Sequence, residues 1–313
     1  MPRVTVQALA KVNLGLRILG RRPDQYHELR TVFQTISLAD RIEVECRRAT
    51  ASRVALTCSR AELAGPGNLA ARAAKRLLAA TGRRARVRIH LEKRIPVGAG
   101  LGGGSSDAGA VLLALWFLLR PRPDWELLWR VAAGLGSDVP FFLLGGRALG
   151  LGRGEEIYPL ADGPARWMLV IAPPIPISTA EAYRRWSADL TRGRREDKIG
   201  GFWSTVCASE PEFEGGEFQE RSGALGNDFE RVVFQSHPSL RKIKARLERL
   251  GARPALLCGS GSALFGVFAN RREAIRARHS LADEPGQCFV VHTVQRSRYR
   301  ALWRQWLKAK RRK

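Results

Sequence analysis

The sequence lacks an apolar run long enough to cross a membrane. The apolar stretch at 111–119 falls well short of the roughly 20 residues that a spanning helix needs. The first residues also lack the apolar block and cleavage site of a signal peptide. Both absences predict a cytoplasmic protein with no integral membrane association.

Cysteine and histidine are scarce and scattered. The chain has 5 cysteines, an odd number with no C-x-x-C pair, which predicts reduced thiols rather than disulfides. Its 5 histidines show no H-x-x-x-H pattern. No metal-binding motif is therefore recognised, and we predict no metal-ligating side chains.

Acidic residues are few: 29 stand against 53 lysines and arginines, for a formal charge of +24. This excess permits a nucleic acid, a membrane surface or an anionic small molecule as partner. The arginines are spread along the whole chain and no RNP or GXXG signature occurs, which disfavours nucleic acid.

The hydrophobic pattern predicts strands with interspersed helices, hence an α+β protein. Alternation predicts strands at 3–9, 10–20, 30–38, 41–46, 85–93, 166–174, 255–269 with a central turn, and 288–294. Helices are predicted at 69–80, 106–119, 125–136, 179–186, 227–235, 238–251 and 271–282. A boundary near 155–165 divides the chain into 1–160 and 161–295, with an extension at 296–313. Residues 191–223 have no firm periodicity and are interpreted as a loop or insertion.

The most informative stretch is "PVGAGLGGGSSDAGA" at 96–110, with six glycines, two serines and one aspartate before an apolar run. It matches G-x-G-x-x-G, but neither a dinucleotide fold nor a P-loop fits its surroundings, because no strand directly precedes it and no lysine follows. Glycines let backbone N–H groups approach a ligand, Ser105 and Ser106 add hydroxyls, and a helix N-terminus follows. Together they predict a polyphosphate site.

This loop resembles the phosphate loop P-x-x-x-G-L-G-S/G-S-S of the GHMP kinase superfamily. Further stretches, "AKVNLGLRILGRRPDQYHEL" at 10–29 and "GSDVPFFLLGG" at 136–146, are similar to its cytidine-linked kinases of the non-mevalonate isoprenoid pathway. The resemblance implies two domains, an N-terminal ribosomal-S5-like β/α domain and a C-terminal α/β domain, with the active site in the cleft between them. It implies ATP and Mg²⁺ as cofactors. The implied ATP-binding residues are Pro96, Gly98, Gly100, Leu101, Gly102, Gly103, Gly104, Ser105 and Ser106.

The resemblance also assigns catalytic roles. On strand alternation alone, Lys11 and Asn13 would occupy an ordinary solvent face. By resemblance they face the cleft, where Lys11 would assist deprotonation of the attacked hydroxyl or neutralise the moving phosphoryl group, and Asn13 would bind substrate. Asp138, by itself a turn aspartate, becomes the general base. Phosphoryl transfer needs mostly positioning and charge stabilisation, so this pair and a cradling loop suffice.

Three aromatic residues are assigned to the nucleobase in the same way. Tyr26 would stack on cytosine, His27 would hydrogen-bond the base edge, and Tyr183 would supply a second stacking face. Gln25 stands where the family usually has glycine, which predicts a local change in the loop before Tyr26. The small-molecule partner is therefore a cytidine-diphosphate-linked alcohol.

The stretch "CGSGSA" at 258–263 resembles a third motif of the superfamily, a glycine turn that supports the phosphate loop and substrate. Gly259, Ser260 and Gly261 are its assigned residues, although a tight hairpin turn explains them nearly as well. For Cys258 we expect a packing role.

The extension at 296–313 carries nine basic residues and no acidic one. Its apolar residues fall on one helical face. We expect a terminal helix docked on the body, and the alternative is a peripheral contact with an anionic membrane or RNA. The chain is expected to be a monomer or weak homodimer. Two other functions remain open: a homoserine- or mevalonate-type kinase, which the Tyr26–His27 pair disfavours, and an RNA-binding protein.

Overall fold

The computed structural model describes residues 3–119, 124–190 and 226–308. The N-terminal half forms a six-stranded mixed sheet in the order β3-β4-β2-β5-β6, with β1 paired to β2. Its strands are β1 (Arg3–Arg21), β2 (His27–Arg48), β3 (Arg53–Cys58), β4 (Ala85–Glu92), β5 (Arg147–Leu151) and β6 (Glu156–Pro159). The C-terminal half forms a four-stranded antiparallel sheet in the order β10-β7-β9-β8. Its strands are β7 (Trp167–Ala172), β8 (Ala255–Leu257), β9 (Leu264–Phe268) and β10 (Gln287–His292).

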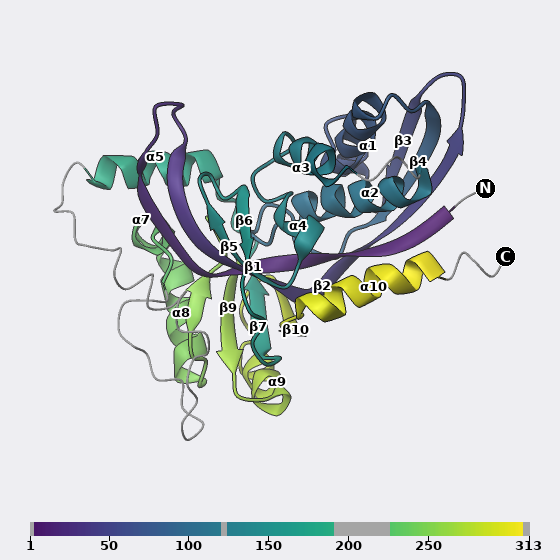
Figure 1. Cartoon of the computed structure of the whole chain (residues 1–313). Helices are drawn as coiled ribbons and strands as arrows, with labels where there is room; N and C mark the ends of the chain where they lie inside the picture. The colour runs from purple at the N-terminus through teal and green to yellow at the C-terminus, as the bar shows by residue number, and fades with distance from the viewer. Residues whose placement is uncertain (1–2, 120–123, 191–225, 309–313) are drawn as a thin grey trace.

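The first two strands are longer than the alternation predicted. β1 runs without interruption through both predicted segments, and β2 does the same. Register shifts along their pairing, between Leu9 and Lys11 and again between Asn13 and Gly15, absorb the changes of phase. Such bulges bend a strand, and in Figure 1 both strands curve from one half of the molecule into the other.

The helices form two groups, one with each half of the chain, and α5 of the second group packs against α7 (Figure 1). The N-terminal group is α1 (Leu69–Ala80), α2 (Gly103–Leu119), α3 (Trp125–Ala133) and the single turn α4 (Phe141–Leu144). The C-terminal group is α5 (Thr179–Leu190), α7 (Phe229–Ser236), α8 (Pro238–Arg249) and α9 (Arg271–Ser280). Asn68 and Asp124 cap α1 and α3 through side-chain oxygens.

Each half has its own apolar core, and a third cluster joins them. In the N-terminal core α1 and α2 pack against the sheet, and in the C-terminal core α7, α8 and α9 do. The joining cluster brings Val12 and Ile36 of the first sheet together with Phe265 of the second and with Leu101 of the glycine loop. The loop is therefore held where the two halves meet.

One helix boundary differs from the sequence prediction. Helix α2 begins at Gly103, three residues earlier than expected, so Gly103, Gly104 and Ser105 form its first turn. The terminal helix α10 (Arg296–Lys308) returns to the N-terminal half and runs alongside β1 (Figure 1). The predicted insertion at 191–223 lies outside the described residues. No helix among the described residues is long and apolar enough to span a bilayer.

Candidate active site

A cavity of about 750 Å³ lies where the two halves meet, and it collects residues from distant parts of the chain. Its walls come from β1, the turn before β2, the glycine loop, the 136–138 turn, α5 and the 259–260 turn. Of the residues assigned from the sequence, it is lined by Lys11, Asn13, Tyr26, His27, Gly100, Gly102, Asp138, Tyr183, Gly259 and Ser260. The tertiary structure thus brings phosphate-loop, catalytic and base-binding candidates into one site.

Lys11 and Asp138 form an ion pair at the floor of this cavity. The Lys11 ammonium lies 3.3 Å from a carboxylate oxygen of Asp138 and donates a 2.8 Å hydrogen bond to Asn13 Oδ1. Lys11 and Asn13 are only 4% and 2% exposed, so they do not form a solvent face. Asn13 in turn donates to Thr31 Oγ1 at 2.7 Å, which fixes its amide. A carboxylate held beside an ammonium can accept a proton from a bound alcohol.

The glycine loop reaches the cavity through Gly100 and Gly102. Gly100 has φ +78°, and a Cβ there would overlap the Cys258 carbonyl oxygen, so the position has no room for a side chain. A Cβ on Gly102 would lie 3.0 Å from both the Lys11 side chain and the Phe142 ring. The Leu101 carbonyl accepts a hydrogen bond from the backbone N–H of Lys11 at 3.0 Å, and the Leu101 side chain is buried. The loop backbone is therefore seated directly on the strand that carries Lys11.

Other loop residues lie beside the cavity rather than lining it. Gly103, Gly104 and Ser105 open α2, where the first backbone N–H groups of a helix are available to an anion. Pro96 and Gly98 do not line the cavity. Pro96 is half-buried, and Gly98 is exposed. The Ser106 side chain is buried, and its hydroxyl donates to the Leu9 carbonyl at 2.7 Å. A serine has one O–H, so that internal bond leaves none for a phosphate.

The base-binding candidates surround the mouth of the cavity. The His27 and Tyr183 rings stack at 4.6 Å between centroids, and His27 Nε2 bonds Ser187 Oγ at 2.8 Å. Tyr26 is 55% exposed and carries the Arg153 guanidinium 4.7 Å from its ring centroid. Burial, and then the charge of Arg21, lowers the pKa of His27 and favours the neutral imidazole. Tyr183 thus stacks on His27, and Tyr26 leaves an open ring face.

Gln25 keeps the backbone geometry of a glycine. Its φ is +70°, the left-handed region that favours glycine. The turn is closed by the Arg22 N–H on the Tyr26 carbonyl at 2.7 Å and by the Gln25 N–H on the Arg22 carbonyl at 3.1 Å. The substitution of glycine noted in the sequence therefore adds backbone strain to this turn.

The 258–263 turn supports the glycine loop, as its motif suggested. The Ala263 N–H donates to the Ala99 carbonyl at 3.1 Å, and the Asn227 amide donates to the Gly259 carbonyl at 2.6 Å. Gly259 and Ser260 line the cavity, whereas Gly261 does not. Cys258 is completely buried, and burial raises the pKa of its thiol to about 12 although Lys11 acts in the opposite direction. A neutral buried thiol has a packing role.

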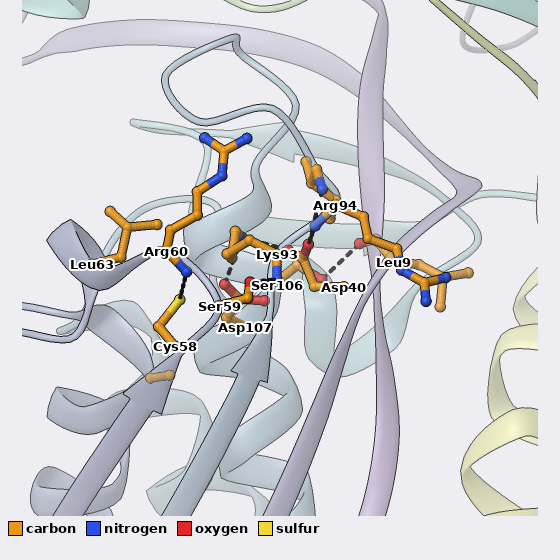
Figure 2. A network of polar contacts seen from close by, with 12 residues as sticks. Leu9, Asp40, Cys58, Ser59, Arg60, Leu63, Lys93, Arg94, Ser106 and Asp107 are labelled. Atoms are coloured by element: carbon orange, nitrogen blue, oxygen red, sulfur yellow. Dashed lines mark hydrogen bonds and ion pairs between the residues drawn. The ribbon is translucent and has the colours of Figure 1, made fainter. Parts of the chain in front are cut away.

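A buried charge cluster beside the loop was not predicted. Lys93 pairs with both Asp40 and Asp107, and Figure 2 shows its ammonium between the two carboxylates. Asp40 also accepts the N–H groups of Arg94 and Ile95 at 2.5 and 2.9 Å. The cluster ties the segment before the loop to α2 after it. One feature of the sequence could have indicated this cluster: Asp107 is the charged residue of an otherwise apolar helix. A buried charge needs a partner of opposite charge.

The comparisons with known proteins agree with this geometry. Family models for the GHMP kinases N terminal domain and the GHMP kinases C terminal match residues 68–146 and 212–287. The 4-diphosphocytidyl-2-C-methyl-D-erythritol kinase of Solibacter usitatus is 47% identical over 304 residues, 96% of this chain and 92% of the relative. This chain belongs to the 4-diphosphocytidyl-2-C-methyl-D-erythritol kinase family.

Other relatives support the same family and fold. The 4-diphosphocytidyl-2-C-methyl-D-erythritol kinase of Geobacter metallireducens is 40% identical, covering 93% of this chain and 98% of the relative. A crystal structure of 4-(cytidine 5'-diphospho)-2C-methyl-D-erythritol kinase is 38% identical with TM-score 0.75, over 92% of this chain and 98% of that one. A homoserine kinase from Cytophaga hutchinsonii, 16% identical with TM-score 0.68 over 94% and 95% of the two chains, shares the fold alone. The predicted GHMP kinase fold and family are thereby confirmed.

Proposed function

We propose that this chain transfers the γ-phosphoryl group of ATP to the 2-hydroxyl of 4-diphosphocytidyl-2-C-methyl-D-erythritol, a step in non-mevalonate isoprenoid precursor synthesis. The observation that carries the proposal is one cavity that contains the Lys11–Asp138 pair, the glycine loop and the Tyr26–His27 turn. A nucleotide, an alcohol and a nucleobase can therefore occupy one site together.

In the proposed reaction Asp138 accepts the proton of the attacked hydroxyl. Lys11, 3.3 Å from Asp138, offsets the charge that develops on the transferred group. Asn13, anchored by Thr31, orients the Lys11 ammonium through its 2.8 Å hydrogen bond. The products are ADP, the phosphorylated alcohol and a proton that leaves Asp138 for solvent.

The cavity mouth suits the cytidine diphosphate portion. The open face of Tyr26 can stack on cytosine, and the neutral His27 ring can hydrogen-bond the base edge. Arg21, Arg153 and Arg184 also line the cavity and carry positive charge for the diphosphate. Homoserine and mevalonate offer no base for this turn to bind.

ATP would bind with its phosphates at Gly100, Gly102 and the first turn of α2. Mg²⁺ is expected with ATP, and we propose that phosphate oxygens and water supply most of its ligands. The two buried carboxylates beside the loop are paired with Lys93.

The test is ADP formation by the purified chain with ATP and each of three alcohols. We expect turnover with the cytidine-linked substrate and none above background with homoserine or mevalonate. Turnover with either control alcohol in preference to the cytidine-linked one would refute the proposal. An RNA-binding titration over a range of salt concentrations, run on the same preparation, tests the remaining alternative.

A further inference from the structure

The C-terminal helix α10 is bonded to the segment that carries Asp138. Tyr299, in its first turn, is 2% exposed and donates a 2.6 Å hydrogen bond from its hydroxyl to the Phe142 carbonyl. Figure 1 shows α10 returning from the C-terminal sheet to lie along β1, near α4. The last element of the chain thus touches the element that follows the proposed base.

The Phe142 carbonyl lies in a helix of a single turn. Such a helix leaves its last carbonyls without intrahelical partners. The Gly145 N–H donates to the Phe141 carbonyl at 2.9 Å, and the Gly146 N–H donates to the Thr35 hydroxyl at 3.0 Å. Neither N–H therefore donates to the Phe142 carbonyl. Tyr299 satisfies it. Since the Phe142 N–H bonds the Val139 carbonyl at 3.1 Å, the connection continues to the residue after Asp138.

The Phe142 side chain packs beside the glycine loop and α2. Its ring lies 3.0 Å from the position a Cβ would take on Gly102, and the Lys11 chain lies equally close to the same point. Its Cβ lies against Gly109 of α2. Phe142 therefore lies against the glycine loop at Gly102 and against α2 at Gly109.

A second set of contacts fixes α10 in place. The Arg296 N–H donates to Asp162 Oδ2 at 2.6 Å, and its guanidinium donates to the carbonyls of Leu160 and Arg147. A Cβ on Gly145 would overlap the Tyr299 ring, so the chain after α4 is shaped around this side chain. The rotation and depth of the helix are thereby set.

We propose that Tyr299 is a positioning residue, which holds Asp138 and the glycine loop in register with Lys11 through Phe142. The inference rests on the proposed function, because it assigns Tyr299 to that reaction. It gives the C-terminal extension a part in turnover rather than in stability alone. Tyr299 itself touches neither substrate nor the reacting atoms.

The test is Tyr299→Phe in the full chain, with Tyr158→Phe as the matched control. Tyr158 is 51% exposed on β6 and loses the same hydroxyl away from the cavity. For Tyr299→Phe we expect kcat to fall about tenfold, since small displacements of reacting groups are costly. The KM values for ATP and the cytidine-linked substrate should change less than about twofold, because their binding groups remain. The control should match wild type in all three constants.

A purely structural hydroxyl would lower Tm while leaving kcat unchanged well below that temperature, and this result would overturn the proposal. Equal loss of kcat in Tyr158→Phe would overturn it too. If Tyr299→Phe does not fold, Arg296→Lys, which removes a second hold on α10, is measured in the same way with the same expectation. Failure of the proposed function is distinguishable, because wild type itself would then not turn over the cytidine-linked substrate.

Discussion

Replacing Asp107 by asparagine should remove a dependence of stability on pH that the folded protein carries. Asp107 and Asp40 are 2% and 0% exposed, and Lys93 supplies one positive charge for the two carboxylates. The cluster in Figure 2 would therefore carry a net negative charge if both acids were ionised. Burial raises the pKa of Asp107 to about 8; Lys93 opposes this shift and Asp40 adds to it.

The sign follows from proton binding in the two states. The unfolded chain loses the Asp107 proton near pH 3.9, whereas the folded protein retains it up to about pH 8. The stabilisation is thus complete at low pH and is lost as pH rises through the folded pKa. Each unit between these values costs about 1.4 kcal/mol, which amounts to about 2 kcal/mol from pH 5.5 to 7.

The measurement is urea unfolding of wild type and Asp107→Asn at several pH values in that interval. The wild-type unfolding free energy should fall by about 2 kcal/mol relative to the variant as pH rises, because asparagine cannot titrate. Asp283→Asn is the control. Hydrogen bonding to Arg246 lowers the pKa of Asp283, so this carboxyl is ionised throughout the interval in both the folded and the unfolded state. The unfolding free energy of Asp283→Asn should therefore vary with pH in parallel with that of wild type. Parallel curves for wild type and Asp107→Asn would refute the reasoning.

Four further outcomes are expected. Lys11→Ala and Asp138→Asn should each lower kcat by about 10²- to 10⁴-fold with the fold intact by circular dichroism; near wild-type kcat in either would remove its role. Tyr26→Ala should raise KM for the cytidine-linked substrate by about 5- to 150-fold, the equivalent of ~1–3 kcal/mol of stacking, with KM for ATP as the internal control. Since burial and Arg21 lower the pKa of His27, that KM should stay constant from pH 8 down to about 6.5, and an increase already above pH 7 would contradict a neutral ring. Deleting 296–313 should lower Tm by about 10 °C, because the buried side chain of Tyr299 is lost. An unchanged Tm together with loss of liposome or RNA binding would instead show that the segment binds a membrane or RNA.

The local elements followed well from the pattern. Helices α1, α2 and α3 were predicted close to their observed ranges, because a helix depends on neighbours within a few residues. Helix α2 began earlier than predicted because glycines were interpreted as loop, although the first turn tolerates them when the chain is held by tertiary contacts. The continuity of β1 and β2 was missed because bulges change the phase of alternation without ending the pairing.

The site was predicted unevenly for a related reason. Resemblance placed Lys11, Asp138 and the glycine loop in one cleft, and the structure brings them together. No pattern in the chain indicated that the Ser106 hydroxyl turns inward, or that Tyr183 stacks on His27. Both depend on which backbone or ring lies opposite in space.

The sequence by itself determined the α+β class and the family, because these depend on spacing and residue type along the chain. The candidate phosphate loop and catalytic residues came from motifs that resemble that family. Tertiary structure alone decided that one lysine serves two buried carboxylates and that the last helix reaches back to Phe142. Those partners are separated by many residues, and burial, which makes such contacts strong, exists only after the two sheets have packed together.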